Sequence, residues 1–238
     1  MTQNGLEICF SPAIFEAHSD REAVVVIVDI LRATSSICTA FANGVREIIP
    51  VATVEEAREM KSKGYLLAAE RDGYLLDFAD FGNSPFNFTP EKIGGKVVAY
   101  STTNGTGIMK MASECHEVVI GAYLNITALC RWLEEQNRKV IIVCAGWKKR
   151  FSLEDALCAG AIAARLLESG RFITSCDAVH AATDLWKMAE GDLMGYIEKA
   201  AQRSRLRDKG LDDCIGYCHT FDVTGIIPVL RNGKLAAL

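Results

Sequence analysis

The fold is decided by the stretch Val24-Val25-Val26-Ile27-Val28-Asp29-Ile30-Leu31-Arg32-Ala33-Thr34-Ser35-Ser36. Its first five residues are β-branched and have no polar face, so they predict a strand that is covered on both sides, as in an α/β sheet. Asp29 is then expected where the strand leaves the core. This is the carboxyl edge at which open α/β sheets bind their ligands.

Strands and helices alternate along most of the remaining chain. Further apolar strands are expected at residues 47–51, 96–100, 117–121 and 139–144, and helices at 34–43, 53–64, 107–114, 125–137 and 152–170. This alternation predicts an α/β fold with three α/β/α layers and a mainly parallel or mixed sheet. We expect one domain over residues 1–238, because no Pro/Ser-rich linker divides the chain.

Side chains that can cap helices mark several of the expected helix starts. Thr34 or Ser35 can cap the first helix, Thr53 begins a capping box, Asn125 can cap another helix, and Ser152 can pair with Asp155 in a second capping box. The last quarter departs from the alternation, with residues 177–207 mostly helical, 212–218 a short helix and 226–235 a β-hairpin. Residues 70–91 fit neither period and predict a long functional loop.

Composition limits the classes of protein. The chain has 238 residues, a formal net charge of -4 and nine cysteines. It has no apolar run of membrane-spanning length and no basic and apolar start typical of a secretory signal, so we expect a cytoplasmic protein with free thiols and no membrane partner. The charge argues against nucleic acid as a partner, and a homodimer is the expected assembly. The basic residues Arg203, Arg205, Arg207 and Lys209 predict a solvated helix face.

Asp29 and Arg32 flank the exit of the first strand. A carboxylate there can hold Mg²⁺, and the planar guanidinium can bind a phosphate beside the hydroxyls of Thr34 and Ser35 at a helix N-terminus. The alternative is a buried ion pair between Asp29 and Arg32 next to an ordinary helix cap. These residues alone leave both interpretations open.

A second polar loop follows the strand at residues 96–100. The loop Ser101-Thr102-Thr103-Asn104-Gly105-Thr106-Gly107 can form a nest for phosphate, because it combines four hydroxyls and an amide with two glycines. It is not a Walker A loop, since Lys110 comes too late. The alternative is a polar turn. Neighbouring parallel strands deliver their loops to the same edge, which favours one site shared with Asp29.

A third candidate follows the strand at residues 139–144. Cys144 and Arg150 have the spacing of a cysteine-dependent phosphatase loop, in which a thiolate attacks phosphorus. The bulky Trp147 and the single glycine of this loop argue against that interpretation. In the next helix, Glu154 or Asp155 can face the strand ends as a metal ligand or a general acid or base.

Taken together, these motifs resemble the 2-phosphosulfolactate phosphatase family of coenzyme M biosynthesis. The resemblance covers nearly the whole chain and rests on five ordered motifs: 29–35, 70–73, 82–85, 102–106, and Cys144-Ala145-Gly146 followed by 151–155. Ser101 stands where the family often has Thr, and Trp147 is bulkier than usual. The resemblance implies an Mg²⁺-dependent phosphatase that hydrolyses (R)-2-phospho-3-sulfolactate or a related phosphorylated 2-hydroxy acid.

On this hypothesis, the residues take distinct roles at one sheet edge. Asp29 and Glu70 would hold Mg²⁺, and the catalytic residues would be Asp29, Arg32, Glu154 and Asp155. Asp155 or Asp222 could activate water. The small-molecule phosphate ester would be bound by Thr34, Ser35, Arg71, Asn83, Ser84, Thr102, Thr103, Asn104, Gly105 and Thr106. The alternatives are a cysteine phosphatase that uses Cys144 with Arg150, and a non-catalytic anion-binding protein.

Overall fold

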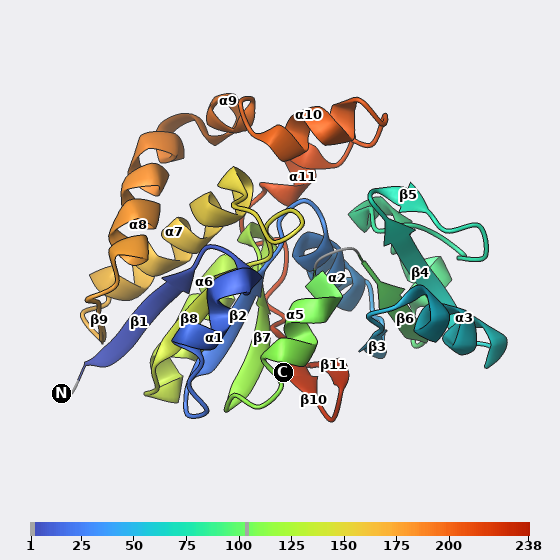
Figure 1. The fold of residues 1–238 in the computed structure, drawn as a ribbon, viewed down its shortest axis with the longest axis horizontal. Helices are drawn as coiled ribbons and strands as arrows, with labels where there is room; N and C mark the ends of the chain where they lie inside the picture. The colour runs from blue at the N-terminus through green and yellow to red at the C-terminus, as the bar shows by residue number, and fades with distance from the viewer. Residues whose placement is uncertain (1–2, 103–104) are drawn as a thin grey trace.

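The computed structural model describes residues 3–102 and 105–238, without the side chains of residues 105 and 106. The strands are β1 (Asn4–Cys9), β2 (Val24–Val28), β3 (Glu47–Pro50), β4 (Leu66–Arg71), β5 (Tyr74–Leu75), β6 (Val97–Ser101), β7 (Glu117–Gly121), β8 (Val140–Cys144), β9 (Phe172–Ile173), β10 (Pro228–Arg231) and β11 (Lys234–Ala237). They form one mixed sheet in the order β5-β4-β6-β3-β11-β10-β7-β2-β8-β1-β9 (Figure 1).

Helices cover this sheet. The α-helices are α1 (Phe15–His18), α2 (Ala33–Ala42), α3 (Val54–Ser62), α4 (Pro90–Ile93), α5 (Gly105–Met111), α6 (Ile126–Gln136), α7 (Leu153–Glu168), α8 (Asp177–Ala189), α9 (Leu193–Ile197), α10 (Ala201–Arg207) and α11 (Ile215–Cys218). Short 3-10 turns are η1 (Pro12–Ile14), η2 (Pro85–Asn87), η3 (Tyr123–Asn125) and η4 (Glu190–Asp192). Over the described ranges, no helix combines the length and apolar content needed to span a bilayer.

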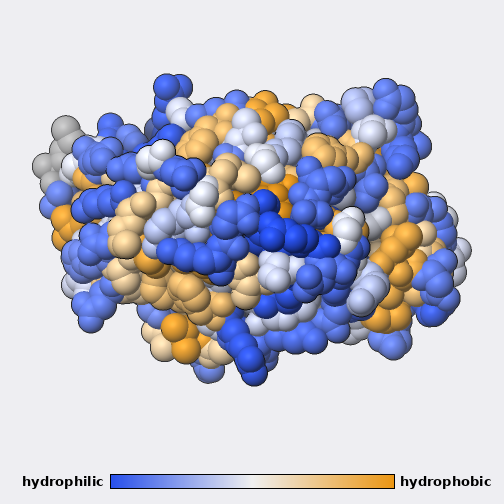
Figure 2. Space-filling view, turned by 90° about the horizontal axis from the view of Figure 1, so that it is seen from above, coloured by the Kyte–Doolittle hydropathy of each residue, from blue (hydrophilic) through white to orange (hydrophobic). Residues whose placement is uncertain are grey.

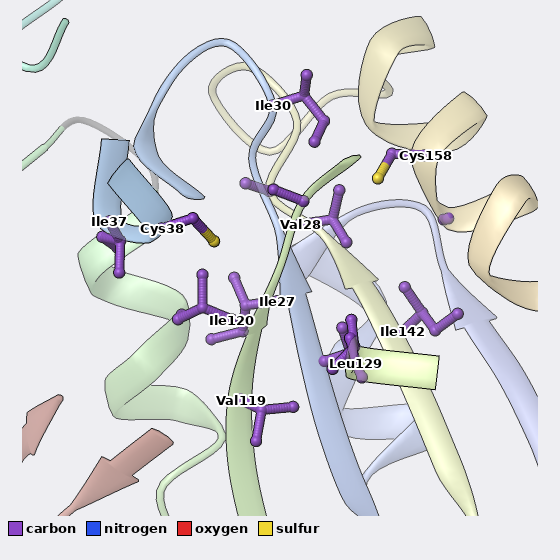
Figure 3. Close-up of a cluster of buried hydrophobic side chains, with 14 of the residues drawn as sticks. Ile27, Val28, Ile30, Ile37, Cys38, Val119, Ile120, Leu129, Ile142 and Cys158 are labelled. Carbon is purple, nitrogen blue, oxygen red and sulfur yellow. The ribbon is translucent and has the colours of Figure 1, made fainter. Parts of the chain in front are cut away.

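Strand β2 is buried along its whole length, as its run of β-branched residues predicts. It pairs in parallel with β7 and β8, and all five of its residues are buried. Figure 3 shows Ile37 and Cys38 of α2 on one side of the strand side chains, and Leu129 of α6 and Cys158 of α7 on the other. The expected three-layer α/β arrangement is therefore confirmed.

The final hairpin lies inside the sheet rather than at its edge. Strand β10 runs antiparallel to β7, with Val229 opposite Val119, and β11 runs antiparallel to β3, with Leu235 opposite Ile48. The hairpin thus joins two parallel blocks, β9-β1-β8-β2-β7 and β3-β6-β4. The sequence predicts the hairpin itself from Asn232-Gly233, where both residues have the positive φ that such a turn requires.

Four strands, β1, β4, β5 and β9, are absent from the elements expected from the sequence. β4 contains Ala68 and Ala69, which favour helix by propensity, but parallel pairing with β6 buries them in a strand. The irregular stretch expected at 70–91 therefore begins inside β4. Beyond it, the stretch includes only β5, η2 and the start of α4.

Of the predicted helix caps, only the capping box of Thr53 and Glu56 is confirmed. The caps predicted for Thr34 or Ser35, for Asn125 and for Ser152 with Asp155 are wrong, since none of these side chains makes a capping hydrogen bond. Asn125, for example, accepts a hydrogen bond from the backbone N–H of Ala122 and donates to two carbonyls. Thr34, Ser35, Asn125 and Asp155 bind nearby backbone groups instead, and Ser152 donates to Glu154.

The C-terminal helical region lies above the carboxyl ends of the parallel strands. In Figure 1, the chain passes from α8 along α9 and α10 and returns through α11. Gln202 of α10 donates a hydrogen bond to the carbonyl of Leu31, at 3.2 Å, and so attaches this region to the turn that follows β2. Helix α10 consequently covers the turn after β2 at this edge of the sheet.

Candidate active site at the carboxyl edge of the sheet

Three acidic side chains from different elements are buried at this edge. Asp29 follows β2, Glu70 lies near the end of β4, and Glu154 is in the first turn of α7. Burial, together with the negative charges of Glu70 and Glu154, raises the pKa of Asp29 to about 7. Burial likewise raises the pKa of Glu154. The structure therefore concentrates negative charge where the sequence predicts a cation.

The turn between β2 and α2 is held by its own hydroxyls. Thr34 Oγ1 accepts a hydrogen bond from the N–H of Asp29 at 3.0 Å, and Ser35 Oγ donates to the carbonyl of Ile30 at 3.0 Å. The N–H of Ala33, at the start of α2, donates to Asp29 Oδ1 at 3.3 Å. Thr34 and Ser35 are fully buried and shape the turn, whereas Asp29 faces the site.

Asp155 connects two loops of the edge. Its Oδ1 accepts from the N–H of Ile30 at 2.8 Å, and its Oδ2 accepts from the N–H of Gly146 at 2.9 Å. This explains why the capping box predicted with Ser152 does not form. Ser152 Oγ instead donates to Glu154 Oε1 at 3.0 Å. Asp155 is a positioning residue for the loops after β2 and β8.

A pocket opens beside Asp29 and Glu70. Asp29, Arg32, Glu70 and Thr102 contribute to its walls from the strand ends. The walls are completed by side chains from other parts of the chain: Leu31, Asp72, Gly73, Asn83, Trp147, Gln202, Arg205, Leu206 and Lys209. The sequence-predicted residues Asp29, Arg32, Glu70, Asn83 and Thr102 are thus brought together.

Arg32 is oriented by the long loop that follows β5. Its Nη2 donates to Asn83 Oδ1 at 2.8 Å, and its Nη1 donates to the carbonyl of Leu211 at 3.3 Å. The carbonyl of Asn83 in turn accepts from Ser36 Oγ at 2.6 Å. Among the described residues, no ion pair joins Arg32 to Asp29 within 4.0 Å. The buried ion pair between these two residues, which the sequence left as an alternative, therefore does not form.

A second pocket, of about 720 Å³, adjoins the first. It shares Arg32, Glu70, Gly73 and Asn83 with the first pocket, and it adds Ser84. The predicted residues Asn83 and Ser84 therefore border the site from the long loop.

Other predicted residues lie elsewhere. Arg71 does not line either pocket. It donates to the carbonyls of Glu70 and Ala52 and to Ser101 Oγ, and so joins the ends of three strands. Asp222 accepts hydrogen bonds from the N–H and hydroxyl of Thr127 and caps α6, an arrangement that leaves it outside the pocket. Thr103, Asn104 and the side chain of Thr106 lie outside the described residues, and Gly105 is the first residue of α5.

The thiol of Cys144 is poorly suited to nucleophilic attack. It is fully buried, and burial together with the charge of Asp155 raises its pKa well above the ordinary value. Arg150 is exposed, and its backbone pairs with that of Trp147 in a tight turn. Since a thiolate is the reactive form, this geometry gives no support to the cysteine phosphatase alternative.

Arg205 and Lys209 are lining residues that the sequence assigned to a solvated face. Arg203 and Arg207 both pair with Glu198, but only Arg207 belongs to the surface, because the Arg203 side chain is 16% exposed. Arg205 instead packs over the ring of Trp147, with its guanidinium carbon 4.9 Å from the ring centroid. A signal was present in the sequence: residues 202, 205, 206 and 209 follow a helical period and share one face.

The donor set suits Mg²⁺ better than a softer metal. Mg²⁺ is usually bound by one or two carboxylates, with waters and phosphate oxygens completing its shell. Asp29 and Glu70 line the same pocket and are almost fully buried. Within the described residues, no group of three or more His, Cys, Asp or Glu side chains is arranged to enclose a metal. The two carboxylates therefore fit an ion that depends on its substrate for the remaining ligands.

Comparison with known proteins assigns the chain to a class and a family. A polar pocket at the carboxyl edge of the sheet is typical of α/β enzymes that act on small molecules. The descriptions of the matching family and relatives identify the class of enzyme as phosphoric monoester hydrolases. Residues 9–233 match the family model described as 2-phosphosulpholactate phosphatase. The chain belongs to the 2-phosphosulpholactate phosphatase family.

Curated relatives agree with this assignment. A probable 2-phosphosulfolactate phosphatase of Caldanaerobacter subterraneus subsp. tengcongensis is 39% identical over 217 residues, which cover 90% of each chain. Its counterpart in Thermotoga maritima is 38% identical over 87% of this chain and 89% of its own. That of Clostridium perfringens is 32% identical over 97% of this chain and 95% of its own. In each comparison, the similarity thus extends over most of both sequences.

Proposed function

We propose that this chain is an Mg²⁺-dependent phosphatase that hydrolyses (R)-2-phospho-3-sulfolactate, or a related phosphorylated 2-hydroxy acid, to the hydroxy acid and phosphate. The observation that carries the proposal is the single pocket in which buried Asp29 and Glu70 lie beside the guanidinium of Arg32. Family membership and the names of the relatives support the substrate class. The proposed setting is the cytoplasm, as a homodimer, and the nine cysteines, all unpaired, are consistent with a reducing compartment.

Asp29 and Glu70 would hold the ion, which would neutralise the charge that develops on the phosphoryl oxygens during transfer. Arg32, fixed by Asn83, would donate its remaining N–H groups to the phosphoryl group. Thr102 would add a hydroxyl from the end of β6, and we assign Thr103, Asn104, Gly105 and Thr106, which follow it, to the same phosphate-binding loop. Thr34, Ser35 and Arg71 would act indirectly by fixing the turns around this pocket.

We assign the role of accepting the proton of the attacking water to Glu154, whose charge acts on Asp29 although Glu154 does not itself line the pocket. Its raised pKa brings proton exchange closer to neutral pH, which favours general base catalysis. Asp155 would hold the loops in place through the two backbone N–H groups that it binds. Gln202 and Leu206 of α10 would limit the access of bulk water from above.

Phosphate release from (R)-2-phospho-3-sulfolactate tests the proposal. We expect the purified protein to be inactive in EDTA and active after Mg²⁺ is restored, and Asp29→Asn to lose nearly all turnover while its circular dichroism spectrum is unchanged. Cys144→Ala should keep the activity. Full activity in EDTA that disappears with Cys144→Ala would instead establish the cysteine mechanism. Tight phosphate binding without turnover would establish an anion-binding protein.

A further inference from the structure

The helix α10 presents the basic side chain of Arg205 to the pocket and that of Arg207 to the surface. Arg203 and Arg207 both pair with Glu198. Arg205, between them in the sequence, has no carboxylate partner within 4.0 Å among the described residues. Its Nε donates to Gln202 Oε1 at 2.7 Å, and its guanidinium packs over Trp147. Its guanidinium is within electrostatic reach of Glu154 but forms no ion pair with it, which leaves the other N–H groups of Arg205 available toward the pocket that it lines.

The orientation of Arg205 is fixed by its contacts with Gln202 and Trp147. Gln202 is buried, with 7% of its surface exposed, and its amide nitrogen donates to the carbonyl of Leu31 beside the catalytic turn. Its amide oxygen at the same time holds Arg205. Arg205 is thus oriented through Gln202 by the same turn that carries Asp29. Stacking on Trp147 fixes the plane of the guanidinium from the side.

A second cationic side chain lines the pocket two residues beyond the end of α10. Lys209 lines the pocket, donates to the carbonyl of Asp72, and lies with Nζ 4.3 Å from the centroid of the Tyr74 ring. Gly73 gives it room, because a Cβ at that position would lie 3.2 Å from Lys209 Nζ. Figure 2 shows strongly hydrophilic side chains across the middle of the face seen from above.

The two walls of the pocket differ in chemistry. The strand-end wall carries Asp29 and Glu70, which suit a metal-bound phosphoryl group, whereas the opposite wall carries Arg205 of α10 and Lys209 of the turn that follows it. We propose that Arg205 and Lys209 bind the sulfonate of the substrate and so select a phosphorylated hydroxy acid with a second strong acid group. This inference rests on the proposed function and deepens it.

The chemistry of the substrate explains why the sulfonate is assigned to this wall. The carboxylate is attached to the same carbon as the phosphate ester, so it remains close to Arg32 and the strand ends. The sulfonate is one carbon farther away and is permanently ionised, with three acceptor oxygens. A fixed guanidinium and a lysine ammonium are the donors that such a group requires when it leaves water.

Specificity between two substrates tests this inference. 2-Phospholactate has the phosphate and the carboxylate but not the sulfonate. We expect Arg205→Gln to lower kcat/KM for 2-phospho-3-sulfolactate relative to 2-phospholactate about 30-fold, as the loss of one charge-assisted hydrogen bond implies. The effect should fall mainly on KM. Lys209→Gln should act in the same direction, and Arg205→Lys should restore part of the preference.

Arg207→Gln is the matched control, because it removes a positive charge from the same helix without touching the pocket. It should leave the preference between the two substrates unchanged. Equal losses on both substrates for Arg205→Gln, or no loss on either, would overturn the inference.

Calorimetric titration with 3-sulfolactate separates this inference from the proposed function. If the wild-type protein hydrolyses neither ester, the proposed function fails, but the binding measurement still decides the role of Arg205. A Kd about 30-fold higher in Arg205→Gln would support the role. An unchanged Kd, or no binding of 3-sulfolactate to the wild-type protein, would refute it.

Discussion

Replacing Asp29 by Asn should stabilise the metal-free protein at neutral pH while it removes activity. Burial raises the pKa of Asp29 from 3.8 in the unfolded chain to about 7 in the folded one. The folded state therefore holds the proton more tightly. The stability that this protonation contributes is fully present below pH 3.8, and it is lost as the pH rises from 3.8 to about 7.

The magnitude follows from the size of this shift. A difference of about 3 pKa units corresponds to about 4 kcal/mol at 1.36 kcal/mol per unit, which is the cost of ionising Asp29 in the folded protein. Asn has no such charge and keeps an oxygen that can accept from the N–H of Ala33, a bond whose effect on the carboxylate is already contained in this pKa. We therefore expect the variant to gain about 4 kcal/mol above pH 7.

Urea unfolding in EDTA at pH 4, 6 and 8 measures this gain. The difference in the free energy of unfolding between Asp29→Asn and the wild-type protein should be near zero at pH 4 and should reach its full value by pH 8. Added Mg²⁺ should stabilise the wild-type protein by mass action, and it should have little effect on the variant. A variant that is less stable than the wild-type protein at every pH would refute this account of the site.

The remaining predictions concern the framework of the site and the core. Asp155→Ala leaves the N–H groups of Ile30 and Gly146 without their acceptor, so urea unfolding should show a loss of about 3 kcal/mol, with Asp155→Asn intermediate; an unchanged free energy of unfolding would contradict the positioning role. Gly121→Ala would place its Cβ 2.7 Å from Val26 Cγ1 and should cost about 1–3 kcal/mol. Its control, Gly216→Ala, meets nothing within 4 Å and should not destabilise the protein.

The sequence predicted those parts of the fold that local pattern determines. The β-branched run of β2 has only one way to be buried, so both its central place and the exit of Asp29 at the carboxyl edge follow from it. Alanines in β4 and the mixed composition of β1 carry no comparable pattern. Their strands exist because β6 and β8 offer hydrogen-bonding partners that are distant in the sequence.

The sequence likewise predicted only part of the candidate site. Asp29, Arg32, Glu70, Asn83 and Thr102 were recognisable from the sequence, because polar residues directly after buried strands, or in one long loop, meet at a shared edge. Helix caps were predicted less well, since a buried carboxylate or hydroxyl binds whichever backbone N–H the fold brings near.

By itself, therefore, the sequence determined the layered α/β fold, the sheet edge that carries the candidate site and several of the acidic and basic residues that line it. Only the tertiary structure decided that the hairpin joins two parallel blocks, that Asp155 connects two loops, and that Arg205 faces the pocket while Arg207 faces solvent. The physical reason is that strand runs and helical periods are local properties. Which groups meet across the sheet edge depends on packing between segments that are distant in the sequence, such as Ile30 and Asp155.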